Sequence, residues 1–300
     1  MTHTTFRVGH LTCHALEAGS QHLDGGAMFG VVPKPLWERR IRADARNRIP
    51  LALRCLLVEH PDGLVLIDTG LGNKEDAKFR DIYGVQNEGA TGRTRLEDAL
   101  AELRYKPEDI RWVINTHLHS DHAGGNTYRE PVERAPDGPT VRPSDRPTLV
   151  SFPRATYVVQ QGELEFARHT NERTAASYLP HNFEPVAFRT IDGAAELLPG
   201  VRCLPTPGHV PFHQSVLVES AGEHVCFLAD VVPTSAHLPL PWIMGYDLQP
   251  LVTLESKRQL YRRAEAEGWL LFFEHDPAVV AGRLGREGKG FGLVEALRAG

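Results

Sequence analysis

The stretch WVINTHLHSDH, residues 112–122, decides the fold. Its apolar beginning predicts a short buried strand, and its second half carries four possible metal ligands. Alternate residues of an extended segment point to the same side, so His117 and His119 can direct two imidazoles at one metal ion. Asp121 and His122 follow where the chain must turn, and they can face a second metal ion. Such nitrogen and oxygen ligands suit zinc, iron, cobalt or manganese better than calcium or magnesium.

Three further candidate ligands lie later in the chain, each after a predicted strand. They are His209 after residues 201–204 and a Pro-Thr-Pro-Gly turn, Asp230 after residues 225–229, and His275 after residues 270–273. Four ligands in one loop cannot surround two cations, so others must come from elsewhere. Buried polar side chains at strand ends need partners, and a metal would serve all of them together.

The composition excludes several classes of protein. The 300 residues include 33 Lys and Arg against 38 Asp and Glu, and this formal charge of -5 provides no overall basic field for nucleic acid. The polar first residues and the lack of a long apolar run lead us to expect neither a secretory signal nor a membrane span. The four cysteines are widely spaced and form no C-x-x-C pair, which favours free thiols and a cytoplasmic protein.

The order of the predicted elements is typical of two packed sheets with helices outside. Residues 55–59 and 64–68 predict a hairpin, and helices are expected at about 94–104 and 250–266. Strands resume after each of these regions, and no linker clearly divides the chain. We therefore expect a single domain over residues 1–300, with an N-terminal extension at about 17–50 and a proline-rich insertion at about 131–153.

The motifs together resemble those of the metallo-β-lactamase-fold hydrolases. The H-x-H-x-D-H run, the Gly-His after a strand, the later Ala-Asp and the final His after an apolar strand carry the resemblance. Asp68, in the run IDTG, also matches the early D-T-G turn of that family, so the resemblance covers at least residues 55–276. It implies an α/β (α+β) fold, an αββα sandwich of two mixed β-sheets flanked by helices, with the site at one edge between the sheets.

The resemblance also implies two divalent metal ions per chain, most simply zinc, with manganese, iron or cobalt as alternatives. By motif, the first ion would bind His117, His119 and His209, the second Asp121, His122 and His275, and Asp230 would bridge them. Asp68 would either orient a ligating imidazole or close the hairpin turn with Gly70. Isolated histidines such as His213, His224 and His237 are expected to be surface or hydrogen-bonded residues.

Such a site predicts hydrolysis of a lactone or another small ester. Two neighbouring cations can share a water, lower its pKa and present a bridging hydroxide to a carbonyl. Asp121 is the candidate catalytic residue, because it can hold the second metal and relay a proton to the leaving group. No cysteine occupies the bridging position, as one does in true zinc β-lactamases. The likeness is nearest to the lactonase and organophosphate-hydrolase branch.

One departure from that branch concerns the substrate carbonyl. Quorum-quenching lactonases usually place a tyrosine three residues after the bridging aspartate, where this chain has Pro233. Tyr178, Tyr246 or Thr234 are the candidates to replace its hydroxyl.

Aromatic and apolar residues in expected loops are candidates to line a substrate pocket. These are Phe29, Trp37, Tyr178, Phe183, Trp242, Met244 and Tyr246. The alternative for all of them is the core. Phe29 and Trp37 have a further interpretation as the contact of a homodimer, because exposed apolar patches often form interfaces.

Several other functions stay open at this point. A glyoxalase-type thioesterase or an organophosphate hydrolase would use the same metals, although no basic cluster for glutathione is evident near the C-terminal end. A mononuclear iron dioxygenase would use chiefly His117, His119 and Asp230. RNA processing is disfavoured by the acidic balance. A metal-binding protein without catalysis would leave Asp121 without a role.

Overall fold

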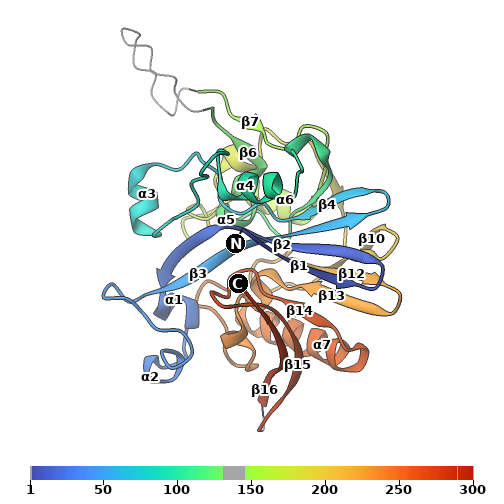
Figure 1. Cartoon of the computed structure of the whole chain (residues 1–300). Helices are drawn as coiled ribbons and strands as arrows, with labels where there is room; N and C mark the ends of the chain where they lie inside the picture. The colour runs from blue at the N-terminus through green and yellow to red at the C-terminus, as the bar shows by residue number, and fades with distance from the viewer. Residues whose placement is uncertain (1, 131–145, 289, 300) are drawn as a thin grey trace.

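The computed structural model describes residues 2–130, 146–288 and 290–299. Within these residues two large mixed β-sheets lie face to face, and helices cover their outer faces (Figure 1). The predicted αββα sandwich is confirmed. Most of the predicted proline-rich insertion falls on residues 131–145, which lie outside the described residues. Its last part includes β7 (Leu149–Val150), which pairs with β6 (Thr127–Tyr128).

The first sheet joins an antiparallel meander to parallel strands. Its strands, in spatial order, are β1 (His3–Val8), β2 (Leu11–Asp24), β3 (Arg48–His60), β4 (Gly63–Ile67), β5 (Ile110–Ile114), β8 (Thr156–Gln160) and β9 (Phe188–Ile191). From β1 to β4 the pairs are antiparallel, and from β4 to β9 they are parallel. The predicted hairpin is the pair β3 and β4.

The second sheet is also mixed. Its strands, in spatial order, are β10 (Ala195–Leu198), β11 (Val201–Pro205), β12 (Gln214–Ser220), β13 (Glu223–Phe227), β14 (Leu270–Phe272), β15 (Val279–Glu287) and β16 (Gly290–Arg298). The pair β13 and β14 is parallel, and the other neighbours are antiparallel. The hairpin of β15 and β16 was not predicted from the sequence.

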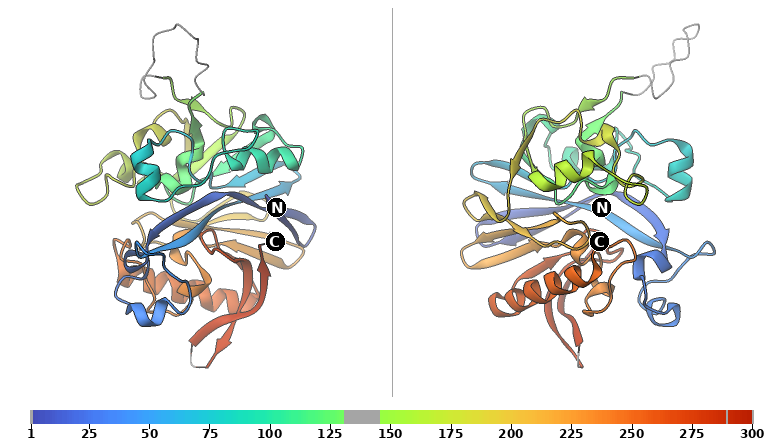
Figure 2. Two further views of the ribbon diagram at one scale, coloured as in Figure 1. Left: turned by 60° about the vertical axis from the view of Figure 1, so that its left-hand side comes forward. Right: turned by 180° about the vertical axis from the view of Figure 1, so that it is seen from behind.

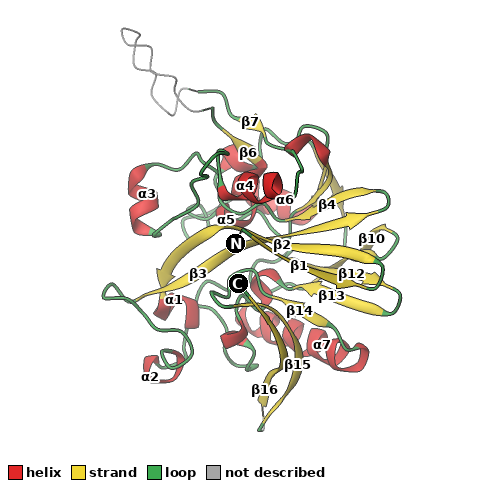
Figure 3. Ribbon diagram, viewed as in Figure 1, coloured by secondary structure: helices red, strands yellow, loops and turns green. Residues whose placement is uncertain are grey.

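The helices lie outside the sheets, as Figures 2 and 3 show. The α-helices are α1 (Gly25–Phe29), α2 (Lys34–Trp37), α3 (Ala77–Ile82), α4 (Arg95–Glu102), α5 (Ser120–Ala123), α6 (Gln161–Arg168) and α7 (Pro250–Glu267). Short 3₁₀ turns are η1 (Pro107–Asp109), η2 (Gly124–Asn126), η4 (Pro180–Asn182), η5 (Ala229–Val231) and η6 (Ser235–His237). The predicted helices near 94–104 and 250–266 are α4 and α7. Among the described residues, no helix combines the length and apolarity needed to cross a membrane.

The core explains the unbroken apolar runs of the strands. In β3, Leu56 and Val58 face the second sheet, where they pack near Val216 and Phe227. Leu57, on the opposite face of β3, joins the cluster that α4 covers. A strand buried on both faces therefore has no polar side to show in its sequence. On the other side of the molecule, α7 covers the outer face of the second sheet.

The segment predicted as an N-terminal extension is joined to the first sheet. Residues 17–24 continue β2, which pairs with β3 along most of its length. Beyond β2, α1 and α2 bury Met28, Phe29 and Trp37 in a cluster that also contains Met244. This packing places the segment beside the loop after η6. The single domain over residues 1–300 stays a prediction.

Candidate metal centre

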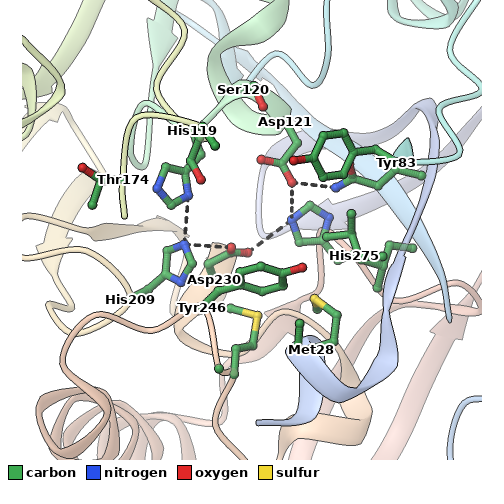
Figure 4. A pocket seen from close by; sticks show the side chains of 18 of the residues that line it. Met28, Tyr83, His119, Ser120, Asp121, Thr174, His209, Asp230, Tyr246 and His275 are labelled. Atoms are coloured by element: carbon green, nitrogen blue, oxygen red, sulfur yellow. Dashed lines mark hydrogen bonds and ion pairs between the residues drawn. The ribbon is translucent and has the colours of Figure 1, made fainter. Parts of the chain in front are cut away.

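Parallel strands bring the candidate ligands to one edge of the sandwich. The carboxyl ends of parallel neighbours lie at the same sheet edge, so the turn after β4, which carries Asp68, adjoins the 117–122 motif after β5. In the second sheet, Asp230 follows β13 and His275 follows β14, which are also parallel. Figure 4 shows side chains from both sheets pointing toward one another across this edge.

His209 reaches the same edge on the turn after β11. Gly208 precedes it with a φ of +135°, in the region that favours glycine. A Cβ at this position would lie 2.3 Å from the backbone nitrogen of Thr253 at the start of α7. The Pro-Thr-Pro-Gly-His turn therefore needs its glycine in order to pack against α7 and direct the imidazole inward.

One group of ligands contains His117, His119, His209 and Asp230, whose ligand atoms lie within 4.8 Å of one another. His209 Nε2 lies 3.1 Å from His119 Nδ1 and 3.2 Å from Asp230 Oδ2. His117 Nε2 is buried and has no hydrogen-bond partner in the described part of the chain.

A second group contains Asp121, His122 and His275. His275 Nε2 lies 3.2 Å from His122 Nε2 and 3.8 Å from Asp121 Oδ2. It also lies 3.2 Å from Asp230 Oδ1. Asp230 therefore adjoins both groups, one through each carboxylate oxygen. The structure thus brings together all seven residues that the motifs indicated.

The donors in these groups fit divalent metal ions. Imidazole nitrogens face each other at 3.1 and 3.2 Å, close to the edge of about 3.3 Å in a tetrahedron of ligands around zinc. Burial and the His122 and His119 imidazoles lower the pKa of His117 well below its ordinary value, so its nitrogen is a neutral donor. Burial raises the pKa of Asp230, but the His209 and His122 imidazoles outweigh it and hold that pKa well below its ordinary value.

The other ring nitrogen of most of these histidines has a partner that sets the ring orientation. His209 Nδ1 lies 3.0 Å from Asp247 Oδ1, and His275 Nδ1 donates to the Ala52 carbonyl at 2.8 Å. His122 Nδ1 lies 3.0 Å from Asp68 Oδ2. Such contacts direct the remaining nitrogen of each ring toward the metal position.

Asp68 is buried in a strained conformation at this edge. Its φ of +54° is rare for a residue other than glycine. The carboxylate accepts from the Thr116 backbone N–H at 2.8 Å and from the Thr116 hydroxyl at 2.6 Å, in addition to its contact with His122. Of the two predicted roles, this geometry matches the orientation of an imidazole.

Comparison with known proteins identifies the family. A family model described as the metallo-beta-lactamase superfamily matches residues 49–275. The chain belongs to the metallo-β-lactamase superfamily. The N-acyl homoserine lactonase AiiA of Bacillus thuringiensis subsp. kurstaki is 30% identical over 234 residues, which cover 75% of this chain and 82% of that protein. The resemblance inferred from the motifs is confirmed, and the protein is a hydrolase of this superfamily.

Solved structures agree with this family. A probable metal-dependent hydrolase from Staphylococcus aureus is 28% identical with a TM-score of 0.83, and the match covers 98% of this chain and 99% of that one. AidC, a dizinc quorum-quenching lactonase, is 19% identical with a TM-score of 0.75, and the match covers 99% and 97% of the two chains. At that identity the second likeness concerns the fold alone.

The two groups of candidate ligands lie at a cavity of about 370 Å³. Polar residues of the centre, Asp121 and Asp230 among them, form one wall. An apolar wall is made by Leu23, Met28, Leu51, Met244 and Leu248. The rings of Tyr83 and Tyr246 also line the cavity (Figure 4). Of the seven residues predicted to line a pocket, Met244 and Tyr246 do so.

The structure places the other five predicted pocket residues away from this cavity. Phe29 is buried between Trp37, with ring centroids 5.2 Å apart, and His237, at 4.4 Å. Trp242 packs edge-on against Phe29. Since Phe29 and Trp37 are both buried within the chain, they do not form the exposed patch that a dimer contact requires. The loop positions expected from the sequence gave no indication of this packing, and Phe29 and Trp37 in fact lie at the ends of α1 and α2.

Phe183 and Tyr178 belong to a core cluster beneath His119. The Tyr178 ring lies 4.7 Å from the His119 ring, and its hydroxyl donates to Glu163 at 2.8 Å. Burial raises the pKa of Glu163 to about 7. The Tyr178 ring therefore packs against the ring of the candidate ligand His119.

Residues that the sequence did not single out complete the site. Gln21 donates to Asp121 Oδ2 at 2.6 Å, Asp247 contacts His209, and Glu274 lies beside His122. Glu274 had one usable signal, a carboxylate directly after the apolar run of β14 and next to a candidate ligand. Gln21 and Asp247 had none, because they are distant from the motifs in the sequence.

Proposed function

We propose that the protein is a dinuclear metal-dependent hydrolase that opens a lactone or cleaves another small ester. The observation that carries this proposal is the position of Asp230 between the two ligand groups, with contacts of 3.2 Å to His209 on one side and to His275 on the other. A buried carboxylate with ligands on both sides suits two adjacent divalent cations.

The residues divide between the two metal positions as their contacts suggest. His117, His119 and His209 would hold one ion, Asp121, His122 and His275 the other, and Asp230 both. Zinc is our first choice, because nitrogen and oxygen donors in this number suit it. When bound, the pair would lower the pKa of a shared water and supply hydroxide near neutral pH.

Asp121 is proposed to move the proton that the reaction must transfer. It lines the cavity, and the hydrogen bond from Gln21 holds one of its oxygens. Burial raises the pKa of Asp121, but the His122 and His275 imidazoles outweigh burial and hold that pKa below its ordinary value. The carboxylate is therefore ionised and can accept a proton. From this position it could pass the proton to a leaving oxygen.

The cavity favours a substrate with an apolar substituent. The polar centre would take the carbonyl end, and the apolar wall formed by Leu23, Met28 and Met244 would take an acyl or alkyl group. The named relatives are N-acyl homoserine lactonases, which supports a lactone as the substrate class.

A mononuclear iron dioxygenase is less consistent with the site, because it would leave Asp121, His122 and His275 without a function. Metal analysis of protein purified without chelators distinguishes the two. We expect close to two divalent ions per chain, whereas a single iron with oxygen-dependent turnover would contradict the hydrolase.

A substrate panel tests the reaction. We expect γ- and δ-lactones, including N-acyl homoserine lactones, to give the highest kcat/KM in a panel that also contains aryl esters, thioesters and phosphotriesters. The apolar wall should make longer acyl chains better substrates than short ones. Efficient turnover of a thioester with no turnover of any lactone would instead indicate the glyoxalase-type activity.

This chain has Pro233 where quorum-quenching lactonases usually have a tyrosine. We propose that the Tyr246 hydroxyl donates a hydrogen bond to the substrate carbonyl instead. The Tyr178 hydroxyl donates to Glu163, and the Thr234 hydroxyl lies 2.8 Å from His237 Nδ1, so both are occupied. Burial and the nearby Tyr83 raise the pKa of Tyr246 to about 12, so its hydroxyl stays protonated and can donate.

Tyr246→Phe is expected to lower kcat on the order of 100-fold, as the loss of one oxyanion donor does. The stability should change little, because the ring is retained. Steady-state kinetics on the best lactone, with metal content measured in parallel, checks this result. Tyr83→Phe, which alters another tyrosine that lines the same cavity, is the matched comparison, and a large loss in that variant alone would assign the role to Tyr83.

A further inference from the structure

Glu274 is a buried carboxylate beside the second group of ligands. It lies two residues after the end of β14, and its side chain is 0% exposed. Its Oε2 lies 3.0 Å from His122 Nδ1, the same distance as Asp68 Oδ2. His122 therefore presents Nε2 to His275 and Asp230 on one side of its ring and meets two carboxylates on the other.

The two carboxylates are not equivalent in their other contacts. Asp68 is also held by the backbone and hydroxyl of Thr116. In contrast, neither oxygen of Glu274 has a well-directed hydrogen bond to any described residue. A single N–H at His122 Nδ1 cannot donate in a straight line to both groups. Leaving a buried carboxylate without a partner is costly unless a positive charge lies nearby.

One place for such a charge is the metal position on the far side of the His122 ring. A carboxylate at Nδ1 makes Nε2 a better donor and holds the ring in the orientation that ligation needs. A second carboxylate adds to both effects and, when the cation is bound, would contribute negative charge toward it. A cation bound at His122 would supply positive charge that offsets the burial of a carboxylate with no well-directed hydrogen bond among the described residues.

We propose that Glu274 is a positioning residue that strengthens binding of the metal ion at Asp121, His122 and His275, and that it stabilises the metal-loaded chain rather than the metal-free one. This inference rests on the proposed dinuclear function. It concerns the affinity of one of the two ions and assigns Glu274 no contact with substrate.

Glu274→Gln tests the proposal, because it removes the charge and keeps the shape. The full-length chain is stripped with a chelator, dialysed and titrated with Zn²⁺ alone, and binding is followed by competition with a zinc indicator. We expect one of the two ions to bind 10- to 100-fold more weakly, the usual effect of losing such a contact, and the other to bind as in the wild type. Thermal unfolding should show an equal or higher midpoint for the metal-free variant and a smaller rise on adding zinc.

Glu163→Gln is the matched control. Glu163 is an equally buried carboxyl near the site, but it accepts from the Leu118 N–H at 2.9 Å and from the Tyr178 hydroxyl at 2.8 Å. The glutamine amide oxygen can still accept both hydrogen bonds and leave His119 in place, so we expect this variant to bind both ions normally and to shift the unfolding midpoint equally with and without zinc. Glu274→Met, which removes the charge and retains the length, serves the same test if the glutamine variant does not fold.

The outcomes separate this inference from the function on which it rests. A wild-type chain that binds two ions, together with a Glu274→Gln variant that binds both equally well, would overturn the role of Glu274 and leave the dinuclear hydrolase intact. A wild-type chain that binds only one ion would overturn both.

Discussion

His209→Ala is expected to deplete the protein of metal and to lower kcat/KM for its best lactone by on the order of 10³-fold. The variant removes an imidazole whose Nε2 lies 3.1 Å from His119 Nδ1 and 3.2 Å from Asp230 Oδ2. It also leaves the buried Asp247 carboxylate without its partner. A metal acting as a Lewis acid contributes several kcal/mol to the transition state, and each step of about 1.4 kcal/mol is tenfold in rate.

Metal content per chain and kcat/KM measured on the same preparation check this result. His224→Ala is the control, because it removes an imidazole on β13 that contacts Glu219 and lies outside both ligand groups. We expect that variant to keep its metal and its activity. Full metal content in His209→Ala would exclude His209 as a ligand.

Asp121→Asn is expected to lower kcat by about 10²- to 10⁴-fold while the chain stays folded, as the loss of a proton-transferring group does. Asparagine has the same size, and its amide oxygen can still accept the hydrogen bond that Gln21 donates at 2.6 Å. The fold therefore loses little. What the variant loses is a negative charge near His122 and His275 and an atom that can take up a proton.

The measurement compares kcat, metal content and the thermal midpoint in one preparation. Asp62→Asn, in the exposed turn between β3 and β4, is the control and should match the wild type in all three. If Asp121→Asn loses activity only in proportion to a loss of metal, Asp121 acts as a ligand alone. Unchanged kcat with full metal content would remove both roles.

The sequence predicted two packed sheets and the candidate ligands because their signals are local. β5 ends at Ile114, shortly before the 117–122 motif, and β14 ends at Phe272, shortly before His275. The chemistry of each ligand is visible in its residue type, and its place at a strand end follows from the hydrophobic pattern. The family resemblance then supplied the topology, which periodicity alone did not determine.

The same signals could not separate pocket residues from core residues. Trp37, Trp242 and Tyr246 all lie in segments that look like loops in the sequence. Whether such a ring faces a cavity or another ring depends on segments far away in the chain, as Phe29 and His237 show by stacking at 4.4 Å. Tyr83 was missed for the same reason, because α3 is short and its place over the cavity is set by packing.

The sequence by itself therefore determined the kind of protein this is, since a metal site requires certain residue types at the ends of buried strands and both features are written locally. Only the tertiary structure decided how those residues are supported and what surrounds them. Glu274 lies beside His122, and Asp247 holds His209 from 38 positions along the chain. Contacts of this kind depend on how the two sheets and their loops pack. Such packing between distant segments produces no periodic pattern in the sequence.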